Sequence, residues 1–347
     1  MRIAIDVSPV SKSSTSAHKV RGVGSYINLL INNLPRYDKK NEYVFVEDDQ
    51  FPEVDLIHYP YFDPFFITLP NVFQVKTVVT VHDLTPLVFP EHFPSGFRGK
   101  LKWFTQRSRL KKVDLIITDS DCSKKDVENI VGISKERIQT VYLAAGEQFG
   151  DIKSENLKLK TRKKFSLPEK FLLYVGDATW NKNLPQLIDA VKKTKYKLVL
   201  VGKVWSDESS NLHPWNKDLH LVRSEIKDND QFLSLGFVSD EDLVAIYNLA
   251  SVLVMPSIYE GFGLPVLEAM KSGCPVICSR GGSLPEVAGD AAVYIGGLNS
   301  DNILPVINNV MQDTSLKEKM SRLGFAQARK FTIEKSMNNL IRAYENT

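Results

Sequence analysis

Two glutamates, Glu260 and Glu268, lie in the segment 257–270 (SIYEGFGLPVLEAM), which directly follows the apolar run 252–255. Glu260 precedes a glycine-rich turn, whereas Glu268 falls in the helix that this turn opens. The two carboxylates therefore come from different elements and can address different parts of one ligand. The alternative is that Glu268 complements the dipole of its helix and Glu260 is a solvated loop acid.

The turn between the two glutamates has the composition of an anion-binding helix start. Its glycines let the backbone turn sharply and come close to a ligand, and Pro265 suits the first position of a helix, where its missing N–H is no loss. A helix N-terminus carries partial positive charge, so it suits oxygens of a phosphate or a sugar. The amides that we expect there belong to Gly261, Phe262, Gly263 and Leu264.

Polar residues also follow apolar runs in the first half of the chain. His82 and Asp83 come directly after the run Thr77–Val81. A histidine at the carboxyl end of a strand can donate a hydrogen bond to a sugar hydroxyl, and the adjacent acid can orient it or an acceptor. The alternative is a structural pair whose hydrogen bonds are satisfied within the protein. Gly22 and Gly24 open the helix after the first run, and they are candidates for close approach to a ligand.

The elements that must position these residues are short apolar runs separated by helical stretches. This pattern is typical of parallel sheets covered on both faces, and we expect an α/β fold with one sheet in each half. In the first half the expected strands are Arg2–Val7, Glu42–Val46, Leu56–Tyr59, Thr77–Val81, Leu115–Thr118 and Ile138–Val141. In the second half they are Phe171–Val175, Lys197–Val201, Leu219–Val222, Phe232–Leu235, Val252–Met255, Val276–Cys278 and Ala292–Ile295.

A length of 347 residues suits two domains. The charged, poorly periodic stretch 146–168 is the best place for a connection between them. We expect an N-terminal domain over 1–165, a second domain over 166–330, and a C-terminal helix at 331–347 that crosses back to the first. In open parallel sheets, ligands bind at the carboxyl ends of the strands, which is where the residues above lie.

The segment around Glu260 and Glu268 resembles the Glu-x7-Glu signature of the retaining glycosyltransferases of family GT4, which have the GT-B fold. The resemblance extends over nearly the whole chain and includes the segments 235–247, 273–279 and 283–292. It implies two Rossmann-like domains that face a cleft. It also implies transfer of a hexose, mannose-like by the region of His82, from a GDP- or UDP-linked donor to a glycan or lipid-linked acceptor, as in polysaccharide biosynthesis.

The same resemblance implies roles for single residues. Glu260 would lie beside the transferred sugar, Glu268 would contact the ribose, and the amides between them would bind sugar hydroxyls. His82 would line the sugar site, and Asp83 would orient His82 or the acceptor. Backbone near Val238 would hold the base.

The diphosphate would be bound by Lys182 and approached by the backbone at Gly22 and Gly24. Here the sequence departs from the family pattern, because Asp177 stands where an arginine commonly follows the glycine of the first strand. One expected cation is therefore missing, or Lys203 or Arg280 supplies it. With Glu260 and His82 holding the sugar, the departing phosphate would take the acceptor proton.

We expect neither a metal nor a cofactor. The two Asp-x-Asp motifs, Asp119–Asp121 and Asp228–Asp230, are interpreted as helix caps or turns rather than as ligands of a diphosphate-bound metal. A net charge of +3 argues against a dedicated nucleic-acid binder. No run approaches the roughly 18 apolar residues of a membrane-spanning helix, and the first residues resemble a strand more than a signal peptide, so we expect a cytoplasmic protein.

The segment 97–112 holds seven cations and no acid. Phe97, Leu101 and Phe104 align on one helical face, while Trp103 and Leu110 align on another. Such a helix can contact anionic lipid headgroups or a lipid-linked acceptor at the inner face of the membrane. A buried helix with solvated charges is the equal alternative.

Two other functions remain open at this point. A nucleotide-sugar epimerase shares the architecture but needs no acceptor, and a non-catalytic protein of the same fold would bind the donor without transferring it. A nicotinamide dehydrogenase would need Gly-x-Gly-x-x-Gly directly after a strand, which the sequence lacks.

Overall fold

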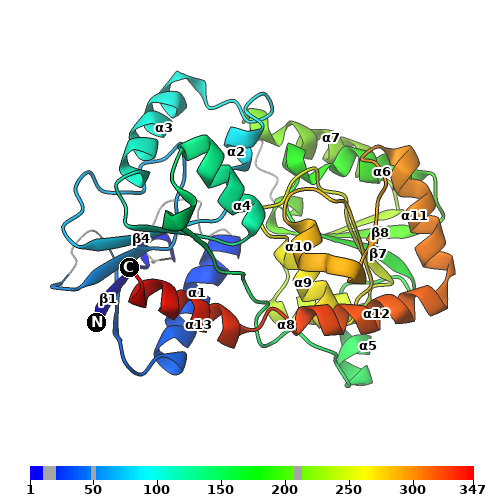
Figure 1. The fold of residues 1–347 in the computed structure, drawn as a ribbon. Coiled ribbons are helices and arrows are strands. Elements are labelled where there is room, and N and C mark those ends of the chain that lie inside the picture. The colour runs from blue at the N-terminus through cyan, green and yellow to red at the C-terminus, as the bar shows by residue number, and fades with distance from the viewer. Residues whose placement is uncertain (11–20, 48–51, 207–212) are drawn as a thin grey trace. The chain divides into compact units, whose positions relative to one another are not determined.

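The computed structural model describes residues 1–10, 21–47, 52–206 and 213–347, and the chain forms two compact units (Figure 1). Unit 1 comprises residues 1–144 and 331–347, and unit 2 comprises residues 145–330. The division falls after Ala144, earlier than the boundary near residue 165 that the sequence indicated. The cause is the helix α5 (Glu155–Lys164), which packs against α8 (Asp240–Leu249) and so belongs to unit 2.

Unit 1 is built on a parallel sheet with the strand order β2-β1-β3-β4-β5-β6. Its strands are β1 (Arg2–Asp6), β2 (Glu42–Val46), β3 (Leu56–Tyr59), β4 (Lys76–Val81), β5 (Leu115–Thr118) and β6 (Ile138–Thr140). Its helices are α1 (Arg21–Tyr37), α2 (Thr85–Val88), α3 (Gly96–Leu110), α4 (Asp121–Asp126), which a π turn continues to Val131, and α13 (Ile333–Glu345). All six strands expected in this half are therefore confirmed within two residues at each end.

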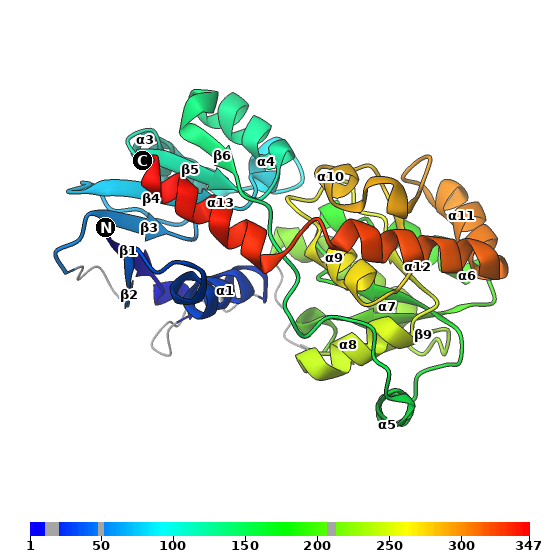
Figure 2. The same ribbon diagram turned by 60° about the horizontal axis from the view of Figure 1, so that its bottom comes forward.

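Both faces of the sheet in unit 1 are buried, as expected for parallel strands. Successive side chains of a strand point to opposite faces, so Ile3 and Ile5 join one core cluster while Ala4 joins the other. The first cluster is covered by α1 and α13, which lie side by side (Figure 2). The second is covered by residues that include Leu110 of α3 and Val127 and Val131 after α4.

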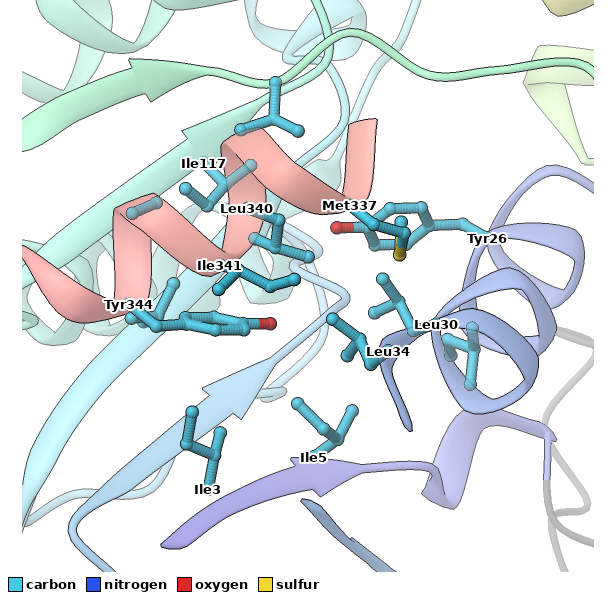
Figure 3. Close-up of a cluster of buried hydrophobic side chains, with 14 of the residues drawn as sticks. Ile3, Ile5, Tyr26, Leu30, Leu34, Ile117, Met337, Leu340, Ile341 and Tyr344 are labelled. Atoms are coloured by element: carbon cyan, nitrogen blue, oxygen red, sulfur yellow. The ribbon is translucent and has the colours of Figure 1, made fainter. Parts of the chain in front are cut away.

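The C-terminal helix α13 completes the first of these two clusters. Its apolar side chains point toward those of α1 and of the sheet (Figure 3). The labelled residues are Met337, Leu340, Ile341 and Tyr344 of α13, Tyr26, Leu30 and Leu34 of α1, Ile3 and Ile5 of β1, and Ile117 of β5. The hydroxyl of Tyr344 also reaches the buried ring of His58, 2.7 Å from Nδ1. Helix α13 is therefore part of the core of unit 1 although it follows unit 2 in the sequence.

Unit 2 contains a second parallel sheet, with the order β12-β11-β10-β7-β8-β9. Its strands are β7 (Phe171–Val175), β8 (Lys197–Val201), β9 (Phe232–Gly236), β10 (Val252–Met255), β11 (Val276–Cys278) and β12 (Val293–Tyr294). Besides α5 and α8, its helices are α6 (Leu184–Lys192), α7 (Lys217–Ile226), α9 (Leu264–Lys271), α10 (Leu284–Ala288), α11 (Ser300–Gln312) and α12 (Thr314–Ala328).

One expected strand of unit 2 is wrong. The run Leu219–Val222 lies in α7, where Leu219 and Val222 are both buried. These two residues are three apart, which places them on the same face of a helix. A short apolar run of this length fits either element, and here the flanking helical residues decide.

In each sheet the strand order reverses direction at one point. In unit 2, the chain adds β8 and β9 on one side of β7, then returns to place β10 on the other side. In unit 1, β2 lies on one side of β1 and β3 on the other. Loops that leave neighbouring strands at such a point diverge, and they leave a crevice where ligands of open α/β sheets bind.

Because Leu340 is fully buried in the cluster of α1 and α13, Leu340→Ala should lower the free energy of unfolding of unit 1 by about 2–5 kcal/mol. Arg342→Ala, an exposed change on the same helix, should cost less than about 0.5 kcal/mol. Urea denaturation, monitored by hydrogen exchange of the α1 amides, measures the free energy of unfolding of both variants. Equal stability of the two variants would contradict the assigned role of α13.

Candidate functional site

The lysine and the first glutamate singled out from the sequence form an ion pair in unit 2. Lys182 Nζ lies 2.9 Å from each carboxylate oxygen of Glu260. Lys182 follows β7 and Glu260 follows β10, and these two strands are neighbours at the reversal of strand order. The pair therefore stands where the fold leaves a crevice for a ligand.

This ion pair is largely removed from water. The side chain of Lys182 is 19% exposed and that of Glu260 is 10% exposed. Ser257 Oγ donates to Glu260 Oε1 over 2.6 Å, so one carboxylate oxygen receives hydrogen bonds from two donors. Ser257 is fully buried, and the sequence did not single it out.

The loop that carries Glu260 is held from behind by the turn after β11. The Glu260 carbonyl accepts hydrogen bonds from the amide and the hydroxyl of Ser283, each at 3.0 Å. A Cβ on Gly282 would lie 2.2 Å from the Glu260 carbonyl oxygen, and one on Gly281 would lie 2.3 Å from that of Ile258. Since no side chain fits at either position, the two glycines allow a close approach of backbones that fixes the position of Glu260.

The loop that carries Lys182 is tied to the same segment. The Asn181 side chain donates to the Tyr259 carbonyl over 3.0 Å, and the amide of Ile258 donates to the Asn181 carbonyl over 2.7 Å. Asn183, which has a left-handed backbone, donates from Nδ2 to the Pro256 and Leu298 carbonyls. These contacts set the geometry of the Lys182–Glu260 pair through backbone atoms as well as side chains.

Helix α9 begins directly after the Glu260 loop, at Leu264, one residue before the Pro265 that the sequence indicated as its first position. Gly263 precedes it with φ 91°, a conformation that favours glycine, and a Cβ there would lie 2.7 Å from Leu284 Cδ2. The segment Gly261–Leu264 therefore leads into the positive end of the helix dipole. Glu268 lies on α9, and its Oε2 accepts a hydrogen bond from Tyr247 over 2.9 Å. Val238 is buried in the loop between β9 and α8.

Asp177, which stands at the expected place of a cation, takes part in a local turn. Its Oδ1 accepts from Thr179 Oγ1 over 3.1 Å, and its carbonyl accepts from the buried Tyr174 hydroxyl over 2.6 Å. Of the two cations offered as substitutes, Arg280 is exposed beside Gly281, and its guanidinium lies 4.0 Å from the ring centre of Tyr294. Lys203 is also exposed, after β8.

His82 pairs with a residue that the sequence reading assigned to a helix cap. His82 Nδ1 lies 2.7 Å from Asp119 Oδ2, and Nε2 lies 3.1 Å from the Pro60 carbonyl oxygen. Asp119 is therefore not a cap; the capping residue of α4 is Ser120, which accepts from the Ser123 amide, and Asp121 lies in the first turn. The pairing arises because β4 and β5 are neighbours, so the residues just after them meet.

The charge of Asp119 changes the protonation of His82. Burial by itself lowers the pKa of His82, but the charge and the hydrogen bond of Asp119 outweigh it and raise that pKa above its ordinary value. Burial also raises the pKa of the Asp119 carboxyl, against the opposing charge of His82.

The remaining candidates of unit 1 lie near the ends of β1 and β4. Asp83 Oδ1 accepts from the Thr85 amide over 2.8 Å, which fixes the turn after His82. Gly22 and Gly24 lie in the first turn of α1. A Cβ on Gly22 would meet no described atom within 4 Å, and one on Gly24 would lie 3.7 Å from Val10 Cγ1. Packing within the described residues therefore does not require glycine at either position.

The residues described here include no group of three or more His, Cys, Asp or Glu side chains arranged to hold a metal ion. The two Asp-x-Asp motifs belong to different units, Asp119–Asp121 to unit 1 and Asp228–Asp230 to unit 2. Asp228 adopts a left-handed turn conformation, and Asp230 forms an exposed ion pair with Lys197.

Two family models match the chain. The model described as glycosyl transferases group 1 matches residues 157–327, and the model described as glycosyltransferase family 4 matches residues 13–144. The chain is 33% identical to the O-antigen chain mannosyltransferase B of Escherichia coli over 84% of its own length and 75% of that protein. It is 30% identical to the serotype-specific mannosyltransferase WbdA of the same species, over 74% of its length but 32% of that protein.

Solved structures resemble the fold over its whole length. A sucrose-phosphate synthase from Thermosynechococcus elongatus superimposes with a TM-score of 0.76 at 18% identity, covering 99% of this chain and 98% of that one. The Anabaena protein Alr3699/HepE, solved in complex with UDP-glucose, superimposes with a TM-score of 0.75 at 17% identity, covering 100% of both chains. The fold of this chain is the GT-B fold.

Removing one partner of the buried ion pair should destabilise unit 2. Lys182→Met leaves the Glu260 carboxylate buried without this cation, and we expect the free energy of unfolding to fall by about 3 kcal/mol. The double variant Lys182→Met with Glu260→Gln should recover part of this loss, because no buried charge remains. Chemical denaturation measures both.

The matched control is Lys193→Met, which removes a cation whose side chain is 43% exposed and pairs with Asp189. It should cost much less than Lys182→Met, because water and salt screen an exposed ion pair. If Lys182→Met is no more destabilising than this control, the pair is not a buried one in solution.

Proposed function

Because the chain belongs to glycosyltransferase family 4, we propose that it is a retaining hexosyltransferase that moves a sugar from a nucleotide diphosphate to a hydroxyl of a glycan or lipid-linked acceptor. Mannose is the favoured sugar and GDP-mannose the favoured donor. The relatives named as mannosyltransferases support this choice, while the UDP-glucose complex of the Anabaena protein keeps UDP-linked hexoses as the second candidate.

The observation that carries the proposal is the Lys182–Glu260 pair, placed at the strand reversal and next to the start of α9. A leaving diphosphate develops negative charge, which an ammonium group and a helix N-terminus can stabilise. The carboxylate beside that ammonium suits the developing positive charge or the hydroxyls of the sugar. A catalytic site for glycosyl transfer needs a positive group for the phosphate and a carboxylate for the sugar, within the length of one hexose diphosphate.

The proposed reaction breaks the bond between the anomeric carbon and the distal phosphate oxygen. The acceptor oxygen forms the new bond on the same face of the sugar, and its proton passes to the departing phosphate. In unit 2, Lys182 and the amides of Gly261 to Leu264 stabilise the phosphate charge, while Glu260 holds the sugar and Glu268 the ribose. In unit 1, His82 and Asp83 contact the sugar or the acceptor, and Gly22 and Gly24 admit the diphosphate.

We further propose that transfer needs no metal ion, since Lys182 and the start of α9 supply the counter-charge. Arg280 is the candidate for the cation missing at Asp177, because it is exposed in the turn that also holds Glu260. The enzyme acts in the cytoplasm, at the inner face of the membrane where lipid-linked acceptors are extended.

The activity is tested by incubating the full chain with GDP-mannose or UDP-glucose, each with and without a mannose-containing acceptor. We expect the nucleoside diphosphate to appear only when the acceptor is present, and the product to keep the anomeric configuration of the donor by NMR. Glu260→Gln and Lys182→Ala should each lower kcat by about 10²–10³ at saturating donor. Chelation with EDTA should leave the rate unchanged.

The control for these variants is Lys192→Ala, which removes a cation that pairs with Glu225. Lys192 is the last residue of α6, at the end of that helix opposite the Lys182 loop. Wild-type rates for Glu260→Gln and Lys182→Ala would remove the pair from the mechanism. Consumption of the donor without an acceptor would favour an epimerase, and binding without consumption would favour a non-catalytic protein.

Helix α3 presents a surface of the kind that binds membranes. Phe97, Leu101 and Phe104 are 77%, 55% and 76% exposed and lie along one face of the helix. Arg98 and Lys100 are exposed beside them, and an apolar groove of about 710 Å³, lined in part by Phe93 and Trp103, runs next to the helix. In the described part of the chain, none of the helices is long and apolar enough to span a bilayer.

We propose that this surface of α3 binds an anionic bilayer, with the apolar side chains in the interface and the cations at the headgroups. Not every cation of the segment is available for this, because Arg107 and Arg109 donate to the carbonyls of Val131 and Leu69. The buried side of the helix holds Leu110 and Gln106. The sequence left a membrane-binding helix and a buried helix as alternatives. The exposed fractions of Phe97, Leu101 and Phe104 favour the membrane-binding helix.

The triple variant Phe97→Ser, Leu101→Ser, Phe104→Ser should therefore lose most of its co-sedimentation with vesicles that contain phosphatidylglycerol. Arg98→Glu with Lys100→Glu should lose it as well, at low salt most clearly. Vesicles of phosphatidylcholine alone are the control and should bind the wild type weakly. Equal binding of wild type and both variants to anionic vesicles would exclude this surface.

A further inference from the structure

The His82–Asp119 pair has a feature that a packing role does not explain. Asp119 is buried, and its Oδ1 makes no hydrogen bond with any described residue, whereas Oδ2 is held by His82. A buried polar atom without a partner destabilises the fold, because its lost hydration is not replaced. An apolar residue at position 119 would avoid this cost, so the carboxylate points to a role that depends on its charge.

The partners of the His82 ring determine where its protons are. Nε2 faces the Pro60 carbonyl, which can only accept, so Nε2 carries a hydrogen. Nδ1 faces a carboxylate, which accepts when it is ionised. Both ring nitrogens are therefore donors, and the ring is an imidazolium whose charge Asp119 balances.

Other contacts fix the ring in this orientation. The ring of Tyr26, from α1, meets that of His82 edge to face, with centroids 5.0 Å apart. Ser123 Oγ, from α4, donates to the His82 carbonyl over 2.9 Å. The backbone and the side chain of His82 are thus both held by the turn that follows β5.

The charged groups around His82 favour its protonated form. Asp119 approaches from the end of β5, and Asp83 directly follows His82 after β4; against the lowering by burial, both carboxylates raise the pKa of His82. Of the titratable groups on neighbouring elements, Tyr26 is buried with a pKa well above its ordinary value, and burial lowers the pKa of His58 on β3 to about 3. Both are therefore neutral near pH 7.

We propose that Asp119 is a positioning residue that keeps His82 doubly protonated, so that the ring offers Nε2–H to the transferred sugar as a charged hydrogen-bond donor. Charged donors form hydrogen bonds roughly twice as strong as neutral ones. The inference rests on the proposed function, which places His82 at the sugar. On binding, the sugar takes over or shares the hydrogen that Nε2 donates to Pro60.

The protonation of the ring can be tested without activity. In ¹⁵N NMR of the full chain, both nitrogens of His82 should be protonated at pH 7, with a titration midpoint above the ordinary value of 6.5. In Asp119→Asn the midpoint should fall below that of the wild type, because the strongest charge opposing the effect of burial is gone, while Asp83 and the Pro60 carbonyl remain. A wild-type ring that is neutral at pH 7 would overturn the proposal even if the enzyme is active.

The pH dependence of transfer separates positioning from a merely structural role. The charged donor is present below the raised pKa of His82 and is lost as the pH rises through it. At pH 7, Asp119→Asn should therefore have a kcat about tenfold below wild type. At pH 5.5 it should lie within about twofold of wild type, because its ring is then protonated again. An equal loss at both pH values would contradict the inference.

The matched control is Asp121→Asn. It removes the same charge two residues away, where the carboxylate accepts from Thr140 and Tyr142 instead of from His82. Its His82 midpoint and its pH profile should match those of the wild type. If Asp119→Asn does not fold, the wild-type titration and that of Asp121→Asn still decide the protonation state. If His82 is doubly protonated at pH 7 but the chain transfers no sugar, the proposed function is refuted. The His82–Asp119 ion pair would still be confirmed.

Discussion

The Glu260 carboxylate is buried, and a buried carboxylate is stable only beside a cation or several donors. The sheet of unit 2 meets this requirement by reversing its strand order between β7 and β10, which brings Lys182 within 2.9 Å. Gly281, Gly282 and Ser283 then hold the glutamate loop from behind. The start of α9 follows from the same loop, so the position of the helix dipole depends on the same constraint.

Unit 1 also buries a charged group beside a group of opposite charge, with different residues. Two strands that are neighbours in its sheet, β4 and β5, end in His82 and Asp119, and their charges balance each other away from water. In both units an acid and a base leave adjacent parallel strands at their carboxyl ends. This arrangement puts opposite charges where substrates bind and lets the rigid sheet, rather than the flexible loop, set their spacing.

All but one of the expected strands could be predicted from the sequence, because strands depend on local patterns, and the polar residues after them could be named as candidates for the site. Apolar runs marked β7 and β10, and the polar residues after them marked Lys182 and Glu260. Their pairing could not be predicted from the residues alone, because it depends on which strands are neighbours. The same limit explains Asp119: the Asp-Ser-Asp pattern before a helix indicates a cap locally, and only the contact of β4 with β5 shows its partner. The prediction of a strand at Leu219–Val222 was wrong because the local pattern itself was too short. Four residues carry too little periodicity to separate a strand from a helix.

Helix α13 gives unit 1 an unusual place in the order of synthesis. Residues 1–144 leave the ribosome without the helix that covers one face of their sheet, and His58 lacks the hydroxyl of Tyr344. At about 5–20 residues per second, unit 2 takes roughly 10–40 s to be translated before that helix emerges. Unit 2 can thus reach its native state first, while the residues of unit 1 made earlier keep one apolar face of their sheet uncovered until α13 emerges.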